Sequence, residues 1–574
     1  MNPVSSNRPR SNPDRLLLLW IVVVLVSCLR SSHASSQPQR ARNGMVVAQE
    51  KIAAEVGRDV LREGGTAVDA AVATAFALAV THPAAGNLGG GGFLLYQPSN
   101  GPAIVVDFRE TAPASAHPNM FIKDGVYDPK RHHQSHLAVG VPGTVAGLHL
   151  AWLKAGRLPW KRLVQPAIRL AQQGFIISPN LADSLAQVLP AMKPYAASIA
   201  QFSKAGTPYN PGERLRQPDL AATLKRIAAR GPTGFYQGAT ADLIAREIQA
   251  HGGQITSDDL KSYQAKERLP LRGVYRGFEI VSVPPPSSGG VAILETLNIL
   301  EGWDLSESGF GGSLTIHRIT EALRRSFADR ARFLGDPDSN PALPIDRLLS
   351  KDYAASLRQG IHDSKASKSS PLSFEWPHES GETTHISVLD SKHNAVALTY
   401  TIEDSYGSKI VVPGAGFLLN NEMGDFNPQP GLTDSQGAIG TDPNLAGPRK
   451  RMLSSMSPSM VLKEGRVVLV TGSPGGRTII STVLQTILNT IDFGMNAQEC
   501  VDAPRFHHQW LPDQIVHEPQ AINPDAASVL KLKGHRLHST RAQGAAQVIR
   551  LNPSTGWIEG AADSRDPDSA AMGW

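Results

Sequence analysis

The chain has 574 residues, of which 41% are hydrophobic and 19% charged, a composition that is typical of globular proteins and excludes an intrinsically disordered chain. Its 52 glycines and 42 prolines follow no three-residue period, which excludes collagen. The net charge of +5 includes no run of five basic residues and no basic stripe with interleaved aromatics, so nucleic acid is not an expected partner. We expect a large α/β or α+β protein with room for about three or four domains.

The amino terminus predicts export. Residues 16–27 are apolar or small and follow three arginines, and this stretch is shorter than the roughly 20 residues that span a bilayer. A small-x-small site at Ser32–Ala34 predicts a signal peptide over residues 1–34. Leu25–Cys28 also resembles a lipoprotein signal, in which a lipid on Cys28 would be the only membrane attachment. Both routes lead to the periplasm or the cell exterior; an uncleaved anchor is the remaining alternative.

Cysteine use is sparse, since Cys28 and Cys500 are the only two. If Cys28 is removed or lipidated, the mature chain can form no internal disulfide. Cys500 lies in a segment, 496–502, that we expect to be helical, and we interpret it as a buried structural thiol.

The upstream half alternates helical and strand patterns. We expect a buried alanine-rich helix over 64–80, whose only charge is Asp69, and mostly helices over 144–260. A turn at 86–92, strands at 93–96 and 105–110, and a loop at 284–290 that opens a helix over 291–300 complete this half. The polar, serine- and lysine-rich stretch 363–380 predicts an exposed linker that extends to residue 382.

A β-hairpin follows this linker. Residues 384–389 and 395–402 are β-rich and are joined by a five-residue turn, so Thr383 stands at the head of a strand. Further on, we expect a strand at 467–471, a glycine turn at 472–476 and a helix over 478–491. Glycine amides at a helix start can bind negative charge.

Several familiar signals are missing or weak. The sequence has no GxSxG elbow, no GxxxxGK[ST] phosphate loop and no HExxH zinc motif. Gly89–Gly92 does not match a dinucleotide fingerprint, and we expect a packing turn. His132, His133 and His136 have no carboxylate or cysteine partner at a familiar spacing, so we expect a surface loop there, and we interpret His507–His508 as structural. No metal or organic cofactor is implied.

Thr383 has a possible chemical role. A threonine hydroxyl is a poor nucleophile without a neighbouring base, and cutting the chain just before the threonine frees an α-amino group that can serve as that base. The pKa of such an amine, roughly 7.7–8.0, suits proton transfer near neutral pH. The pattern alone also fits an ordinary strand residue.

The surrounding sequence resembles the γ-glutamyltransferase family, also called γ-glutamyltranspeptidase or glutathione hydrolase, from about residue 44 to the C-terminus. The similar segments are Gly64–Ala71, Asp107–Pro113, Val141–Gly143, Pro284–Gly290, Gly381–Phe426, Arg451–Pro458, Thr471–Gly476 and Ala503–Trp510.

The resemblance implies an α+β fold, the four-layer αββα sandwich of N-terminal-nucleophile hydrolases. It also implies a self-cut between Glu382 and Thr383, which yields a large subunit of residues 35–382 and a small catalytic subunit of residues 383–574 that remain together as a heterodimer. The implied substrates are glutathione and related γ-glutamyl compounds, with water, amino acids or peptides as acceptors.

The resemblance assigns roles to individual residues. Thr383 would be the nucleophile that forms the γ-glutamyl acyl-enzyme, and Thr401 would orient it. A zwitterionic amino-acid head would place its carboxylate on Arg109, Ser454 and Ser455, since a guanidinium fork fits a carboxylate. Its ammonium would lie at Glu422 and Asp425, and the amides of Gly475 and Gly476 would form the oxyanion hole.

Two features depart from the family pattern. Glu403 stands near the expected ammonium site where well-known members carry asparagine, which adds charge and can change donor preference. The loop 427–448 has the length of a bacterial lid but no aromatic residue to cover the site. A more open site, or one suited to longer γ-glutamyl chains, would follow.

Three alternatives stay open. A cephalosporin acylase or a poly-γ-glutamate hydrolase would share the fold, although Arg109, Glu422, Asp425 and the serine pair favour an α-amino-acid head. A non-catalytic amino-acid-binding protein would keep the pocket without turnover, and intact Thr383, Thr401, Gly475 and Gly476 argue against it.

Overall fold

A computed structural model describes residues 37–369, 383–431, 441–552 and 555–574. The expected signal segment, the linker residues 370–382 and part of the loop 427–448 lie outside the described residues. The account below concerns the compact unit Pro38–Trp574. Among the described helices, none is both long and apolar enough to cross a membrane.

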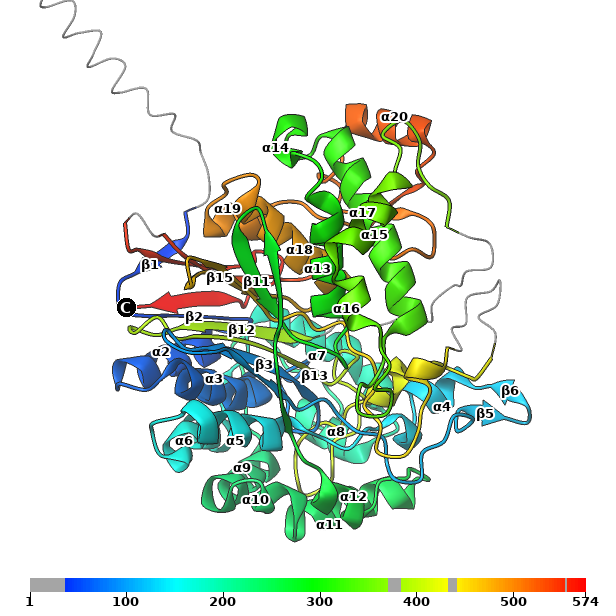
Figure 1. Ribbon diagram of the computed structural model, residues 1–574. Helices are drawn as coiled ribbons and strands as arrows, with labels where there is room; N and C mark the ends of the chain where they lie inside the picture. The colour runs from blue at the N-terminus through cyan, green and yellow to red at the C-terminus, as the bar shows by residue number, and fades with distance from the viewer. Residues whose placement is uncertain (1–36, 370–382, 432–440, 553–554) are drawn as a thin grey trace, which may run out of the picture. The chain divides into compact units, whose positions relative to one another are not determined.

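Two seven-stranded antiparallel sheets form the centre (Figure 1). The first sheet has the strand order β21 (Ala570–Gly573), β2 (Met45–Ala48), β12 (Thr384–Leu389), β13 (Ala395–Thr401), β3 (Gly91–Gln97), β4 (Ile104–Asp107) and β9 (Lys266–Arg268). The second has the order β1 (Gln39–Ala41), β20 (Ile558–Ala562), β19 (Gln547–Leu551), β15 (Arg466–Gly472), β14 (Ser459–Lys463), β11 (Phe278–Ser282) and β10 (Leu271–Tyr275).

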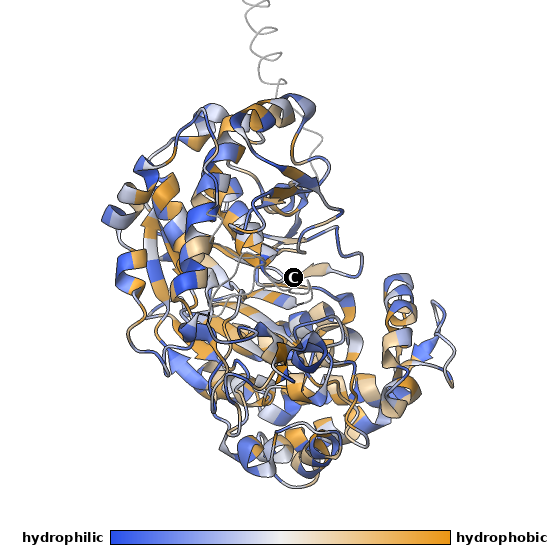
Figure 2. Cartoon of the chain, turned by 90° about the vertical axis from the view of Figure 1, so that its right-hand side faces the viewer, coloured by the Kyte–Doolittle hydropathy of each residue, from blue (hydrophilic) through white to orange (hydrophobic). Residues whose placement is uncertain are grey.

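Helices cover the outer faces of both sheets. One apolar cluster joins the first sheet to α2 (Lys51–Arg62), α3 (Ala67–Thr81), α5 (Thr144–Ala155), α6 (Trp160–Gln173) and α9 (Pro218–Arg230). A second cluster fills the space between the sheets and extends to α13 (Gly289–Leu300), α15 (Ser313–Phe333) and α18 (Thr478–Ile491). The result is the four-layer αββα sandwich that the resemblance implies, and that prediction is confirmed. Hydrophobic residues are frequent along the strands of the two central sheets (Figure 2).

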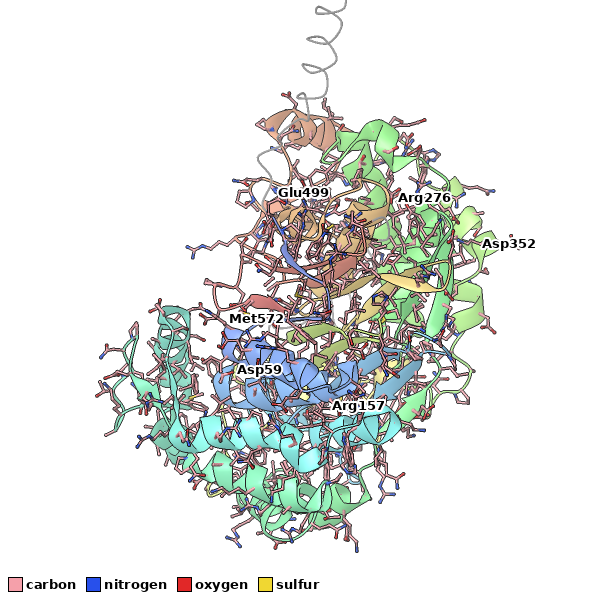
Figure 3. All side chains as sticks on the ribbon, turned by 90° about the vertical axis from the view of Figure 1, so that its left-hand side faces the viewer. Asp59, Arg157, Arg276, Asp352, Glu499 and Met572 are labelled. Carbon is pink, nitrogen blue, oxygen red and sulfur yellow. The ribbon has the colours of Figure 1, made fainter. Side chains whose placement is uncertain are left out.

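The remaining elements are short or peripheral. They are α4 (Pro129–His133), η1 (His136–Ala138), α7 (Pro179–Met192), α8 (Ala196–Phe202), α10 (Thr233–Tyr236), α11 (Ala239–Ala250), α12 (Ser257–Ser262), α14 (Leu305–Ser308), α16 (Ile345–Leu348), α17 (Lys351–Gln359), η2 (Glu422–Asp425), η3 (Asp442–Asn444), α19 (Ala497–Asp502), α20 (Pro524–Lys533), β5 (Ile122–Lys123), β6 (Val126–Tyr127), β7 (Phe175–Ile176), β8 (Arg214–Leu215), β16 (Phe506–His507), β17 (Ile515–His517) and β18 (Leu537–Ser539). At the edge of the first sheet, Met572 of β21 packs on the helical cluster near α2, which carries Asp59 (Figure 3).

The alanine-rich helix α3 is buried along its whole length, as its composition predicts. It begins three residues later than the apolar pattern suggests, because Thr66 caps it in a capping box with Asp69. The Asp69 carboxylate also accepts hydrogen bonds from the amides of Arg157 and Leu158. These donors explain how a charged residue is tolerated in a buried helix.

The predicted hairpin is confirmed as β12 and β13, which lie in the middle of the first sheet. Both strands are buried throughout, and their alternate residues face different layers. Ile386 and Val388 pack on the helices. Ser387 faces the second sheet, where its hydroxyl donates to the Gln547 carbonyl over 2.9 Å. Because side chains alternate along a strand, Thr383 belongs to the Ser387 face, between the two sheets.

The histidines at 132–136 correct one prediction. His132 is fully buried and His136 is 6% exposed, so the expected surface loop is wrong for both. The His132 ring donates from Nε2 to the Met423 carbonyl (2.9 Å), which anchors α4 to η2. A basic local sequence concealed this burial, because the covering segment comes from nearly 300 residues away.

Other local predictions hold. Cys500 is a buried free thiol whose pKa burial raises to about 11. His508 is fully buried and lies 3.3 Å from Asp513, in keeping with a structural role. Of the linker residues that the structure describes, 363–365 and 368 are exposed, whereas Ala366 is buried and the Ser369 hydroxyl donates to the Trp510 carbonyl over 2.6 Å.

Candidate active site

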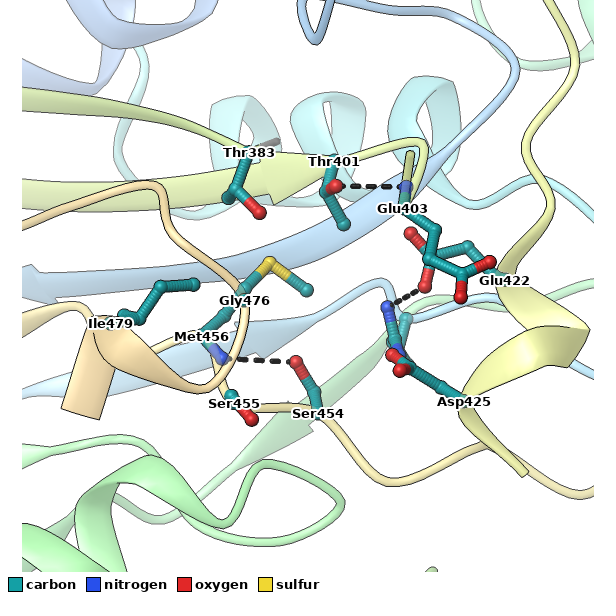
Figure 4. Close-up of a pocket in the computed structure, with 11 residues that line it drawn as sticks. Thr383, Thr401, Glu403, Glu422, Asp425, Ser454, Ser455, Met456, Gly476 and Ile479 are labelled. Atoms are coloured by element: carbon teal, nitrogen blue, oxygen red, sulfur yellow. Dashed lines mark hydrogen bonds and ion pairs between the residues drawn. The ribbon is translucent and has the colours of Figure 1, made fainter. Parts of the chain in front are cut away.

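A pocket opens where the head of β12, the end of β13, η2, the segment 454–456 and the start of α18 meet (Figure 4). Its lining consists of Arg109, Thr383, Thr401, Glu403, Glu422, Asp425, Ser454, Ser455, Met456, Gly476 and Ile479. Nearly all the residues singled out from the sequence are therefore brought together. Gly475 is the exception, because it lines a neighbouring cavity with Pro474 and Thr478.

Thr383 and Thr401 lie side by side at one end of the central hairpin. The β12–β13 register pairs Thr384 with Tyr400, so its continuation places Thr383 opposite Thr401. Each of the two residues is only 4% exposed. Figure 4 shows both side chains directed into the pocket. The pair thus provides two hydroxyls at one end of a small pocket.

Glu403 occupies a strained position just after β13. Its φ is +72°, a left-handed conformation that few residues other than glycine adopt. The Thr401 hydroxyl accepts a hydrogen bond from the Glu403 amide (2.9 Å), which helps to hold this turn. The Glu403 carboxylate lies 3.5 Å from His133 Nδ1, so a histidine that sequence reasoning set aside faces the residue that departs from the family pattern.

A buried charge cluster forms the other side of the pocket. The Arg109 guanidinium contacts the carboxylates of both Glu422 and Asp425, and it donates to the carbonyls of Met452 and Leu453. Burial disfavours its charge, but the surrounding carboxylates more than offset this and raise the pKa of Arg109. The fork expected to hold a substrate carboxylate is therefore shared with two protein carboxylates in this structure.

Glu110 completes the cluster and was missed from sequence. It is fully buried, lies 3.6 Å from Arg109, and neither of its carboxylate oxygens has a hydrogen-bond partner among the described residues. Burial raises the pKa of Glu110 to about 8, against the opposing effect of Arg109. Burial also raises the pKa of Glu422. Burial therefore disfavours the ionised form of both carboxyl groups. The one sequence signal that could have identified Glu110 as a site residue is its position directly after Arg109 in the chain.

The serine pair is anchored by the proline-rich loop 284–290. The Ser454 amide donates to the Pro286 carbonyl over 2.9 Å, and the Ser288 hydroxyl donates to the Ser454 carbonyl over 2.6 Å. Arg330 of α15 donates to the hydroxyls of both Ser288 (2.8 Å) and Ser455 (3.0 Å). Arg330, which was not identified from the sequence, therefore holds Ser455 in place through a direct hydrogen bond and supports Ser454 through Ser288.

Gly475 and Gly476 form the turn before α18. Their φ angles are +131° and +54°, and both conformations favour glycine. A Cβ at Gly475 would lie 2.6 Å from the Thr478 hydroxyl. The Gly475 carbonyl accepts from the Thr478 amide (3.0 Å), so the turn is locked to the first helical turn. Only glycine satisfies both the backbone angle and this close approach.

His385 lies two residues beyond Thr383, on the same strand face. Its Nδ1 is 2.7 Å from the Thr399 hydroxyl and its Nε2 is 3.1 Å from the Ser387 hydroxyl. Burial lowers the pKa of His385 to about 3, so the ring is neutral between the sheets. It therefore supports the strand that carries Thr383.

The described part of the loop 427–448 is tied to the charge cluster. The Asn444 side chain donates to the Asp425 carbonyl over 2.7 Å, and its oxygen accepts from the Leu453 amide over 2.9 Å. The segment after η2 thus braces both Asp425 and the serine segment.

Two groups of described residues have the side chains to hold a metal ion. They are His136, Glu247 and His251, and His317, Glu321 and His535. Neither group lines the pocket with Thr383.

A strand-head threonine at the centre of an αββα sandwich, beside a second threonine, a glycine turn and a buried charge cluster, defines an N-terminal-nucleophile hydrolase. A family model described as gamma-glutamyltranspeptidase matches residues 53–573. The chain belongs to the γ-glutamyltranspeptidase family, and the recognition made from its motifs is confirmed.

Individual relatives agree with this assignment. The chain is 48% identical to a glutathione hydrolase proenzyme of Escherichia coli, over 94% of this chain and 93% of that protein. It is 44% identical to a glutathione hydrolase proenzyme of a Pseudomonas species, over 96% of this chain and 98% of that protein. A crystal structure of a cephalosporin acylase from Bacillus halodurans superposes with a TM-score of 0.80 at 28% identity, over 95% of this chain and 98% of that chain. Sequence identity is thus higher to the glutathione hydrolases than to this acylase.

Proposed function

We propose that this protein is a self-processing γ-glutamyltransferase with glutathione hydrolase activity. The observation that carries the proposal is the convergence, in one pocket, of Thr383 with the charge cluster of Arg109, Glu422 and Asp425. Thr383 offers a hydroxyl that can act as the nucleophile in acyl transfer. The charge cluster offers opposite charges that can bind the zwitterionic head of a γ-glutamyl donor.

The reaction follows from these positions. Cleavage after Glu382 frees the Thr383 amine, which takes the proton of the Thr383 hydroxyl as Oγ attacks the γ-carbonyl. The amides of Gly475 and Gly476 would stabilise the resulting oxyanion. Collapse of the intermediate expels the donor's amine, which receives the proton, and leaves a γ-glutamyl ester on Thr383. Water, or the amine of an amino acid or peptide, then attacks this ester in the same way. Thr401 would orient the Thr383 hydroxyl.

The donor's head group would use the alternating charges of the pocket. Its α-carboxylate would bind Arg109 and the hydroxyls of Ser454 and Ser455, and its ammonium would lie among Glu403, Glu422 and Asp425. Since Arg109 already contacts Glu422 and Asp425, binding requires these two carboxylates to share the guanidinium or to turn toward the ammonium. A carboxylate that turns in this way gives up its contact with the Arg109 guanidinium and gains one with the donor's ammonium.

Processing and location complete the proposal. The mature enzyme would consist of a large subunit, residues 35–382, and a small subunit, residues 383–574. Export would follow from the amino-terminal segment, with a lipid anchor if Cys28 becomes the first residue.

A pair of donors tests the proposal against its rivals. γ-Glutamyl-p-nitroanilide and glutaryl-p-nitroanilide differ only in the α-ammonium, so their relative kcat/KM measures the use of that group. We expect a preference of at least a hundredfold for the γ-glutamyl donor, together with a 192-residue fragment that begins at Thr383. A preference for the glutaryl donor would indicate an acylase. Folded, uncut protein that binds glutamate without turnover would indicate a binding protein.

A further inference from the structure

His136, Glu247 and His251 come together away from the Thr383 pocket. His136 begins η1, whereas Glu247 lies in the last turn of α11 and His251 caps that helix. The Glu247 carboxylate oxygen Oε1 lies 3.1 Å from His136 Nε2 and 3.3 Å from His251 Nδ1. One oxygen and two imidazole nitrogens therefore converge from two separate segments.

These separations match the edges of a metal coordination polyhedron. In a tetrahedral zinc site with bonds of about 2.0–2.1 Å, neighbouring ligand atoms lie roughly 3.3 Å apart. Two histidines and one glutamate are also a donor set that zinc uses in proteins, with the fourth position left to water. We propose that His136, Glu247 and His251 form a binding site for a zinc-type divalent cation with one open coordination position.

The state of each side chain suits this role. The His136 ring is buried, and its Nε2 faces the Glu247 carboxylate, so the fold already holds this nitrogen beside the carboxylate oxygen. The His251 ring donates from Nδ1 to the Glu247 carbonyl (2.9 Å), and coordination through Nδ1 would exchange that hydrogen bond for a metal bond. The two rings are stacked at 4.6 Å, so His251 must tilt to direct its lone pair at a shared ion. Its side chain is 53% exposed, which leaves room for the tilt and an entry path for the ion.

The second cluster lacks these properties and provides a contrast. The Glu321 carboxylate is engaged by Arg324 and Arg325, and His317 lies 2.8 Å from His535 in a mutual hydrogen bond. Cationic partners already neutralise that carboxylate. Glu247, by comparison, makes ion pairs only with His136 and His251 among the described residues.

An ion at this site would clamp η1 to the end of α11. A short path leads from η1 to the pocket, because the Gly140 amide donates to the Asn420 side-chain oxygen (2.8 Å), which also accepts from the Glu422 amide (3.0 Å). The ion would thus stabilise the segment that supports Glu422 without contacting substrate. We therefore expect the bound ion to raise the free energy of unfolding, and with it the Tm.

The test is cation binding to the processed, tag-free enzyme, since a histidine tag would itself bind the probe. Isothermal titration with Zn²⁺ should give one ion per chain, and Co²⁺ should give the intense visible absorption of a tetrahedral site. Zn²⁺, but not Mg²⁺, should raise the Tm. Glu247→Gln keeps the shape of the carboxylate, and His251→Ala alters an exposed ring, so neither should prevent folding. Each should weaken Zn²⁺ binding at least tenfold.

His538→Ala serves as the matched control, because His538 is an exposed histidine outside the cluster. It should bind Zn²⁺ as the wild type does. The proposal is wrong if the wild-type enzyme binds no ion at this stoichiometry, or if Glu247→Gln and His251→Ala bind Zn²⁺ as tightly as His538→Ala.

Discussion

Asp425→Asn tests the charge pattern of the pocket most directly. Asparagine has nearly the shape of aspartate, and its side-chain oxygen can still accept from Arg109, so the fold of η2 should be preserved. The substitution removes one negative charge from the proposed ammonium site. The Asp425 side chain is 14% exposed, so its interaction with a bound ammonium would be only partly screened by water.

The magnitude follows from the strength of a hydrogen bond to a charged group, about 1.5–3 kcal/mol. At about 1.4 kcal/mol per factor of ten, kcat/KM for a γ-glutamyl donor should fall roughly 10- to 150-fold. Glu403 and Glu422 remain near the ammonium, so the lower half of that range is expected. Because the ammonium is bound alike in the ground state and the transition state, most of the loss should appear in KM.

The assay compares γ-glutamyl-p-nitroanilide with glutaryl-p-nitroanilide at pH 7–8. The second donor lacks the ammonium, so its slow turnover should be unchanged or slightly improved by Asp425→Asn. Asp404→Asn is the control, because Asp404 pairs with Lys409 (3.2 Å) and does not line the pocket. An equal loss with both donors would refute the assignment of the ammonium site.

Three further predictions concern the nucleophile, the glycine turn and acid stability. Thr383→Ala should remain one uncut, inactive chain on a denaturing gel, whereas Thr383→Ser should retain some cleavage and turnover; normal maturation of the alanine variant would exclude Thr383 as the nucleophile. Gly475→Ala should lower kcat on the order of 100-fold in steady-state assays, because alanine at φ +131° must displace the turn; an unchanged kcat would remove this turn from catalysis. His385 has a folded pKa of about 3 against an ordinary value of 6.5, so the unfolded chain binds its proton first. The free energy of unfolding should fall between pH 6.5 and 3 by up to about 1.4 kcal/mol per pH unit from this group. His385→Gln should reduce that slope in urea titrations, and an unchanged slope would contradict this role of His385.

The local sequence pattern determined the position of several helices and strands in this protein. The two β-rich runs after the linker, joined by a five-residue turn, predicted the β12–β13 hairpin and placed Thr383 at its head, and the observed α18 spans the residues expected to be helical. The reason is that strand and helix periods are properties of neighbouring residues. The fold was implied by several motifs in one order, which the family assignment supports, and most of the residues that those motifs singled out line one pocket.

Tertiary structure alone decided which polar side chains meet and which are buried. His136 contacts Glu247 across 111 residues, and Arg330 contacts Ser455 across 125, so no local spacing could reveal either pair. The same holds for Glu110, whose raised pKa comes from burial beneath distant segments. Charge and burial at a given side chain depend on what the rest of the chain packs around it, and that is fixed only when the layers of the sandwich assemble.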